Sequence, residues 1–172
     1  MAISLYDAIV PNYLQVLGAI EGVLNKGAAH CKEKNIDPNE IVETRLAPDM
    51  LPFRFQIVAV AHHSAGAIKG VKAGAFGPPS PSTADYAGLQ KLVSEAREAL
   101  ERAKPEEVNS CEGKDVVFSV GDRKLPFTAE GFLQTFSLPN FYFHATTAYD
   151  ILRSKGVPLG KRDFLGKMKM KS

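Results

Sequence analysis

Residues 139–156, PNFYFHATTAYDILRSKG, form the stretch that decides the fold. Its apolar residues recur every three or four positions, as they do on one face of an α-helix. Pro139 is tolerated in a first helical turn, and Gly156 is typical of the residue just after a helix. The line along that face consists of Phe141, His144, Ala148 and Ile151. The segment therefore predicts an amphipathic helix with a histidine on its inner face. Because residues 128–136 are also compatible with a helix, Pro139 either kinks a longer helix or begins its main part.

Three more segments show helical periodicity, and they cover about residues 4–35, 49–73 and 82–104. Ser4 begins the first with the pattern of a capping box. Asp49 is a suitable N-cap for the second, and Ser82 or Thr83 for the third. Four amphipathic helices in one chain predict a helical bundle.

The period changes between Asp115 and Phe127. Val116, Phe118 and Val120 alternate with other residues, and the sequence GDRK follows them. Alternation followed by a turn signal is typical of a β-hairpin. We therefore predict an all-α fold, a four-helix bundle with a small β-hairpin insertion before the last helix.

Length and composition favour a single domain over residues 1–172. The chain is 45% hydrophobic and 23% charged, as in globular proteins. No apolar run approaches the roughly 20 residues that cross a bilayer, and the N-terminus lacks the basic region of a signal peptide. We expect a cytoplasmic protein in which Cys31 and Cys111 are reduced thiols, with a disulfide as the alternative.

The net charge of +2 is unevenly distributed. From Arg153 onward seven basic residues face one acidic residue, so this end carries +6 and the remainder carries −4. A basic tail can bind nucleic acid or an anionic membrane. This tail lacks interleaved aromatic residues, and the acidic remainder would repel phosphate. We therefore expect a solvated tail at about residues 157–172, and neither nucleic acid nor membrane as a partner.

Helical geometry separates the histidines by direction. His62 lies almost opposite the apolar stripe of its helix, so we expect it to face solvent. His63 lies on the flank of that stripe, and His144 faces inward with Asn140 one turn earlier on the same face. Two imidazoles on facing helices can begin a metal site, although a catalytic site usually has three protein ligands. The alternative for His144 is a core histidine hydrogen-bonded to a Tyr, a Thr or a carboxylate.

Three motifs carry a resemblance to a known family. They are PNFYFHATTAYDILRSKGVPLGKRDFLG (residues 139–166), RLAPDMLPF (residues 45–53) and HSAGAIKGV (residues 63–71). Together they resemble an uncharacterised family of domains of unknown function. That family is in turn similar to the DinB/YfiT-like superfamily of four-helix bundles. The resemblance implies an up-down-down-up bundle and a homodimer.

The resemblance also implies site residues. In the superfamily, one histidine of the second helix and an HxxxH pair of the last helix bind a metal. His63 is similar to the ligand on the second helix, and His144 to the second histidine of the pair. Asn140 stands where the pair has its first histidine. His63, His144 and Asn140 are therefore candidate ligands for a divalent metal such as Zn, Ni or Fe.

Two functions from different classes follow from these observations. The first is a bundle that binds a small-molecule ligand or a partner protein as a homodimer, without catalysis. The alternative is a metal-dependent transferase or hydrolase that uses His63 and His144, like metal-dependent members of the superfamily. The sequence does not decide between them, nor does it indicate a substrate.

Overall fold

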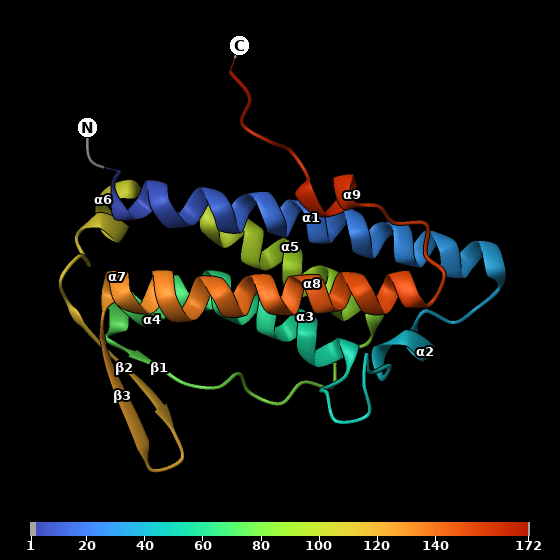
Figure 1. Ribbon diagram of the computed structural model, residues 1–172, viewed down its shortest axis with the longest axis horizontal. Helices are drawn as coiled ribbons and strands as arrows, with labels where there is room; N and C mark the ends of the chain where they lie inside the picture. The colour runs from blue at the N-terminus through green and yellow to red at the C-terminus, as the bar shows by residue number, and fades with distance from the viewer. Residues whose placement is uncertain (1–2, 172) are drawn as a thin grey trace.

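The computed structural model describes residues 3–171, which are mostly helical with a small three-stranded sheet. Figure 1 shows the long helices lying side by side. Helices α1 (Leu5–Lys34) and α8 (Leu138–Ser154) run in one direction, and α3 (Phe53–Ala61), α4 (Ala67–Ala73) and α5 (Tyr86–Glu101) run in the other. The elements are α1 (Leu5–Lys34), α2 (Asn39–Val42), α3 (Phe53–Ala61), η1 (His62–Gly66), α4 (Ala67–Ala73), β1 (Ala75–Phe76), α5 (Tyr86–Glu101), α6 (Pro105–Asn109), β2 (Asp115–Val120), β3 (Arg123–Thr128), α7 (Ala129–Gly131), η2 (Phe132–Ser137), α8 (Leu138–Ser154) and α9 (Lys161–Leu165).

Helix α1 begins where the sequence predicts. The Ser4 hydroxyl accepts a hydrogen bond from the Asp7 amide, and this bond satisfies one free N–H of the first turn. Pro11 lies within the helix and does not end it. Asn35 closes the helix in the left-handed conformation, with φ of 55°.

The second and third long helices begin later than predicted. Helix α3 starts at Phe53 after Pro52, whose extended backbone ends the preceding loop, so Asp49 is not its N-cap. Helix α5 starts at Tyr86, because Asp85 accepts a hydrogen bond from the Gly88 amide and caps the first turn. The predictions that Asp49 caps the second helix and that Ser82 or Thr83 caps the third were therefore wrong.

Two π-helical turns interrupt the long helices, and both adjoin the candidate site. Turn η1 (His62–Gly66) lies between α3 and α4. Turn η2 (Phe132–Ser137) lies between α7 and α8 and ends two residues before Pro139. Proline lacks an N–H group and disturbs the preceding turn, which is a common cause of such an irregularity. Helical structure thus continues through Pro139.

The small sheet has the order β1–β2–β3, with β1 parallel to β2 and β2 antiparallel to β3. Figure 1 shows β2 and β3 projecting from the end of the molecule where α4 and α7 lie. Phe76 of β1 is buried and reaches the histidines described below.

Phenylalanine and tyrosine supply the large side chains of the core, because the sequence contains no tryptophan. Five of them are almost completely buried: Tyr13, Phe53, Tyr86, Phe132 and Phe141. Tyr13 meets Phe141 edge to face, with ring centroids 4.9 Å apart, and so links α1 to α8. Cys31 and Cys111 are both buried and free.

The C-terminal segment is only partly the solvated tail that the charge pattern predicts. Val157 and Leu159 are buried, and α9 packs on α1. Lys26 pairs with Asp163 at 2.7 Å, and the Gln15 side-chain amide donates to the Leu165 carbonyl at 2.8 Å. Apolar anchors and these polar contacts hold the first half, so the exposed basic stretch begins at Gly166. Within residues 3–171, no helix is long and apolar enough to span a membrane.

Candidate functional site

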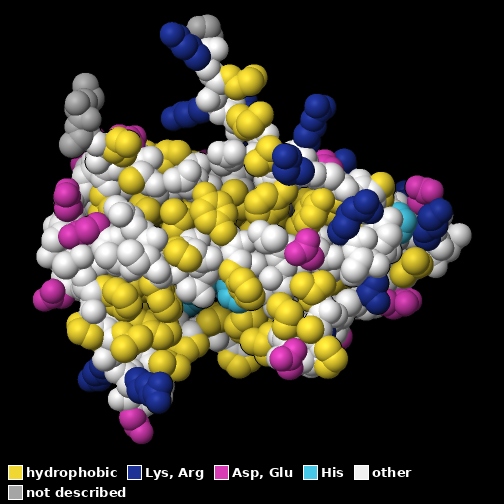
Figure 2. All heavy atoms as spheres, in the orientation of Figure 1, with side chains coloured by type: hydrophobic (Ala, Val, Ile, Leu, Met, Phe, Trp, Pro, Cys, Tyr) yellow, Lys and Arg dark blue, Asp and Glu magenta, His cyan; other side chains and the backbone are white. Residues whose placement is uncertain are grey.

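The structure brings His63 and His144 together. His63 lies in η1 and His144 in α8, and their ring centroids are 5.9 Å apart with ring planes 16° apart. The two residues are far apart in sequence, and the packing of α8 against α3 and η1 makes them neighbours. Figure 2 shows histidine at the surface near the centre of the molecule, among hydrophobic side chains.

His63 is the more buried of the pair. Its side chain is 7% exposed and is surrounded by aromatic rings. The centroids of Phe76 and Phe136 lie 5.5 Å and 5.7 Å from that of His63. The His63 Nδ1 atom is buried and has no hydrogen-bond partner among the described residues. A buried polar atom without a partner is costly, so this nitrogen indicates a group that a ligand would satisfy.

The backbone at His63 is held by a chain of side-chain hydroxyls. The Tyr13 hydroxyl donates to Ser137 Oγ at 3.0 Å, and Ser137 Oγ donates to the His63 carbonyl at 2.8 Å. Ser137 is fully buried and ends η2, so the two π-helical turns meet at this contact. The chain fixes the position of His63 relative to α1 and α8.

His144 is held by its own partner. Its Nδ1 atom lies 2.8 Å from Oε1 of Gln56, a residue of α3 that is 2% exposed. The rings of Phe55 and Phe143 meet the imidazole edge to face, at centroid distances of 5.6 Å and 5.3 Å. The predicted alternative of a hydrogen-bonded core histidine is therefore partly right, but the partner is an amide.

Burial makes both imidazoles neutral near pH 7. Desolvation, together with the smaller effect of the positive charges of His62 and His144 when protonated, lowers the pKa of His63 from 6.5 to about 3. Desolvation also lowers the pKa of His144 to about 4. Two neutral imidazoles offer lone pairs to a metal ion or to a hydrogen-bond donor.

Asn140 lies one turn before His144 on α8, as predicted. Its side-chain nitrogen donates to the Phe136 carbonyl at 2.7 Å. This bond within the helix occupies one end of the carboxamide. Within residues 3–171, no group of three or more His, Cys, Asp or Glu side chains is placed to hold a metal ion.

The prediction that His62 faces solvent was wrong. His62 is half-buried, its Nε2–H donates to the Gly77 carbonyl at 2.7 Å, and its ring stacks on Phe76 at 4.3 Å. The chain after β1 crosses this side of the helix and covers it. The periodicity of one helix cannot show that His62 is covered, because the segment that covers it follows β1 and is not part of that helix.

Gln56 and Ser137 are the residues of the site that the sequence prediction missed. The sequence could have indicated a role for Gln56, since this polar residue lies in the apolar pattern of α3 beside Phe53, Ile57 and Val60. A polar residue at a core position needs a partner. Ser137 carried no comparable signal, because a serine two residues before a proline is ordinary in a turn.

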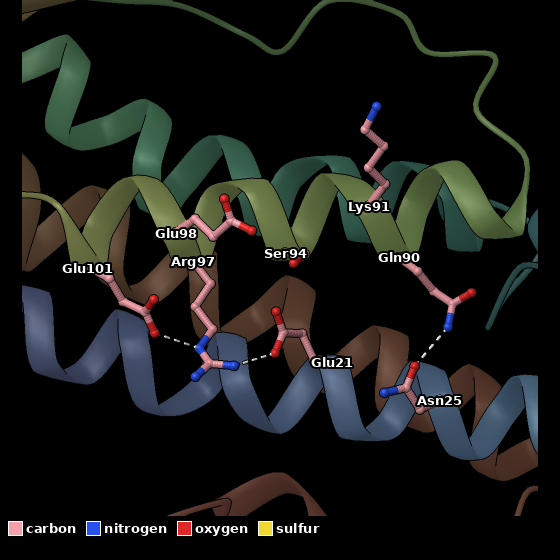
Figure 3. Close-up of a pocket in the computed structure, with 8 residues that line it drawn as sticks. All are labelled: Glu21, Asn25, Gln90, Lys91, Ser94, Arg97, Glu98 and Glu101. Carbon is pink, nitrogen blue, oxygen red and sulfur yellow. Dashed lines mark hydrogen bonds and ion pairs between the residues drawn. The ribbon is translucent and has the colours of Figure 1, made fainter.

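A separate polar cavity of about 560 Å³ lies between α1 and α5, and Figure 3 shows its lining. Arg97 binds Glu21 at 2.6 Å and Glu101 at 3.1 Å, and Gln90 donates to Asn25 at 2.8 Å. These polar groups satisfy one another, and no histidine lines the cavity. It therefore offers a ligand less than the histidine pair does.

The sequence matches the model of a family described as a domain of unknown function, DUF1993, over residues 5–165. The chain belongs to this family. No curated protein matches it. The family assignment fits the resemblance of the three sequence motifs.

One similar solved structure is the crystal structure of a DinB family member protein from Shewanella denitrificans. It is 25% identical in sequence, with a TM-score of 0.79, and the match covers 98% of this chain and 95% of that one. The similarity supports the resemblance of this DUF1993 protein to the DinB-like superfamily. It identifies no ligand and no reaction.

Proposed function

We propose that His63 and His144 bind one divalent transition metal ion through two protein nitrogens. The observation that carries this proposal is the close approach of two neutral imidazoles from different helices, with the buried His63 Nδ1 lacking a hydrogen-bond partner among residues 3–171. Imidazoles that share one metal have metal–nitrogen bonds of about 2.0–2.1 Å, so their ring centroids lie about 5 to 6 Å apart. The distance of 5.9 Å between these rings fits that range.

The residues fit two positions of a metal shell and not three. The described residues supply no third His, Cys, Asp or Glu, and the Asn140 amide is bonded to Phe136. The proposed site therefore leaves coordination positions to water or a small-molecule ligand. Zinc, nickel and iron all accept imidazole ligands. A bound metal would supply polarisation of such a ligand, the chemistry on which metal-dependent transferases and hydrolases depend.

A second candidate is the binding of a small molecule without a metal. The rings of Phe55, Phe76, Phe136 and Phe143 surround the imidazoles, and Phe143 is 57% exposed. Aromatic walls with two neutral hydrogen-bond acceptors suit an apolar ligand that carries a hydroxyl or an amine.

The proposal also includes a DinB-type four-helix bundle with a β-hairpin insertion, assembled as a homodimer. Large exposed hydrophobic side chains support an interface: Leu46, Leu51, Val120, Leu125 and Phe143 are each more than two-fifths exposed. Figure 2 shows extensive hydrophobic surface on the face around the central histidine. Exposed apolar patches of this kind are typical of interaction surfaces. Sedimentation equilibrium of the full chain checks the dimer, and a monomer at all concentrations would contradict it.

Equilibrium dialysis against zinc tests the metal proposal. The full chain, purified without a histidine tag, is dialysed against buffered zinc and analysed for bound metal. We expect about one zinc per chain in the wild type and a loss of binding in His63→Ala and in His144→Ala. His30→Ala, which removes a histidine outside the site, is the matched control and should bind as the wild type does. Zinc retained by both site variants would contradict the proposal.

A further inference from the structure

Gln56 makes hydrogen bonds at both ends of its side chain. Its Nε2 lies 2.7 Å from the Leu51 carbonyl oxygen, and its Oε1 lies 2.8 Å from His144 Nδ1. The side chain is 2% exposed, so water does not substitute for either partner. Burying an amide in this way is favourable only when its donor and acceptor are both used.

The Leu51 carbonyl decides which way the amide faces. A carbonyl oxygen only accepts hydrogen bonds, so the NH₂ group of Gln56 must face Leu51. The amide oxygen then faces His144, and it too only accepts. His144 Nδ1 must therefore carry the proton of this hydrogen bond. In a neutral imidazole the other nitrogen, Nε2, then keeps its lone pair.

We infer that Gln56 is a positioning residue that holds His144 as the Nδ1–H tautomer and leaves the Nε2 lone pair free for a ligand. The inference concerns the site of the proposed function, and its value as a ligand site rests on that function. The tautomer itself is a property of the metal-free chain. In many metal sites a histidine donates its second ring N–H to a carbonyl or carboxylate, which orients the ring and raises its basicity. Gln56 places an amide oxygen in that role.

The loop before α3 has a part in this arrangement. The Phe53 amide donates to the Thr44 carbonyl at 2.8 Å, and the Arg45 guanidinium donates to the Met50 carbonyl. These two bonds close the loop around residues 44–53. They fix the Leu51 carbonyl at the point where it accepts from Gln56. The RLAPDMLPF motif thereby acquires a role, which is to orient His144 through Gln56.

The opposite tautomer would change what the site can bind. With the proton on Nε2, His144 would offer a donor where a metal needs a lone pair. Phe55 and Phe143 meet the ring edge to face and restrict its rotation, so the ring does not turn easily to present its other nitrogen. The choice of tautomer is therefore made by the hydrogen bond to Gln56.

Nitrogen NMR of the metal-free protein tests the inference. Long-range ¹H–¹⁵N correlation spectra of the ¹⁵N-labelled full chain at pH 7 distinguish protonated from unprotonated ring nitrogens. The signals that disappear in His144→Gln assign the ring. We expect Nδ1 to be protonated and Nε2 unprotonated in the wild type, and we expect Gln56→Met to lose the Nδ1–H form as the majority tautomer.

Gln90→Met is the matched control, because it removes a glutamine amide that bonds Asn25 on another side of the molecule. This variant should keep the wild-type His144 tautomer. A wild-type ring protonated at Nε2 would overturn the inference whether or not Gln56→Met folds. So would a folded Gln56→Met protein that retains the Nδ1–H form. Neither result depends on metal binding, so a failure of the inference and a failure of the proposed function are distinguishable.

Discussion

The imidazoles of His63 and His144 lie with their ring centroids 5.9 Å apart, although one belongs to a π-helical turn after α3 and the other to α8. A different set of polar side chains holds each residue. The hydroxyls of Tyr13 and Ser137 hold the His63 backbone, and the Gln56 amide holds the His144 ring. The two rings make up the candidate site, and within residues 3–171 no third His, Cys, Asp or Glu joins them in a group that could hold a metal ion.

Because of His63, the free energy of unfolding should fall as the pH is lowered. Its pKa is about 3 in the folded chain and 6.5 without burial. Between these values the unfolded chain binds a proton that the folded chain excludes, so the free energy of unfolding falls as the pH drops from about 6.5 towards 3. We expect His63→Phe, which keeps a ring beside Phe76 and Phe136, to reduce this loss by at most a few kcal/mol. Urea denaturation at several pH values measures it, and parallel pH profiles for the two proteins would refute this assignment.

Asn140→His should strengthen metal binding. The substitution places a third imidazole one turn before His144 on the same face of α8, and three protein ligands are typical of catalytic zinc sites. We expect zinc affinity to rise by roughly tenfold or more. Competition with a chromophoric chelator measures the change. Thr146→His adds a histidine at an exposed position of the same helix and serves as the control. Equal effects of the two variants would show that position 140 does not reach the site.

The hydroxyl chain behind His63 should behave as one unit. Ser137→Ala leaves the Tyr13 hydroxyl and the His63 carbonyl without their buried partner, at a cost of about 1–3 kcal/mol. The variant that combines Tyr13→Phe with Ser137→Ala should lose less than the sum of the single variants, because one orphaned hydroxyl is then gone. Chemical denaturation of all four proteins completes the double-mutant cycle. Additive losses would show that the two hydroxyls are not coupled.

Two glycines of α1 should respond oppositely to alanine. A Cβ at Gly27 would lie 2.2 Å from the Tyr86 hydroxyl, which donates to the Leu24 carbonyl at 2.8 Å. A Cβ at Gly22 would meet nothing within 4 Å. We expect Gly27→Ala to destabilise the chain by about 1–3 kcal/mol through overpacking. Gly22→Ala should stabilise it by up to about 1 kcal/mol through helix propensity. Thermal unfolding of the two variants checks both signs.

Periodicity predicted the long helical stretches because each places its apolar residues on one face, and it placed the last helix at about residues 139–155, close to the observed bounds of α8, Leu138–Ser154. The predicted starts of α3 and α5 were wrong because each helix has several plausible cap residues near its beginning. The local sequence does not show that the helices begin after Pro52 and Asp85. The direction in which each histidine points from its predicted helix identified His63 and His144 as candidate site residues. It failed for His62, which is covered by the chain after β1. Gln56 and Ser137 act across helices, so their partners emerge only when the packing is known.

The most direct test of the central claim is calorimetric titration of zinc into the metal-free full chain without a tag. The wild type is compared with a variant that carries both His63→Ala and His144→Ala. If the two imidazoles bind a metal, the wild type will take up one zinc ion per chain and the double variant will lose that binding. Absence of zinc binding in the wild type, or equal binding by the double variant, would contradict the claim.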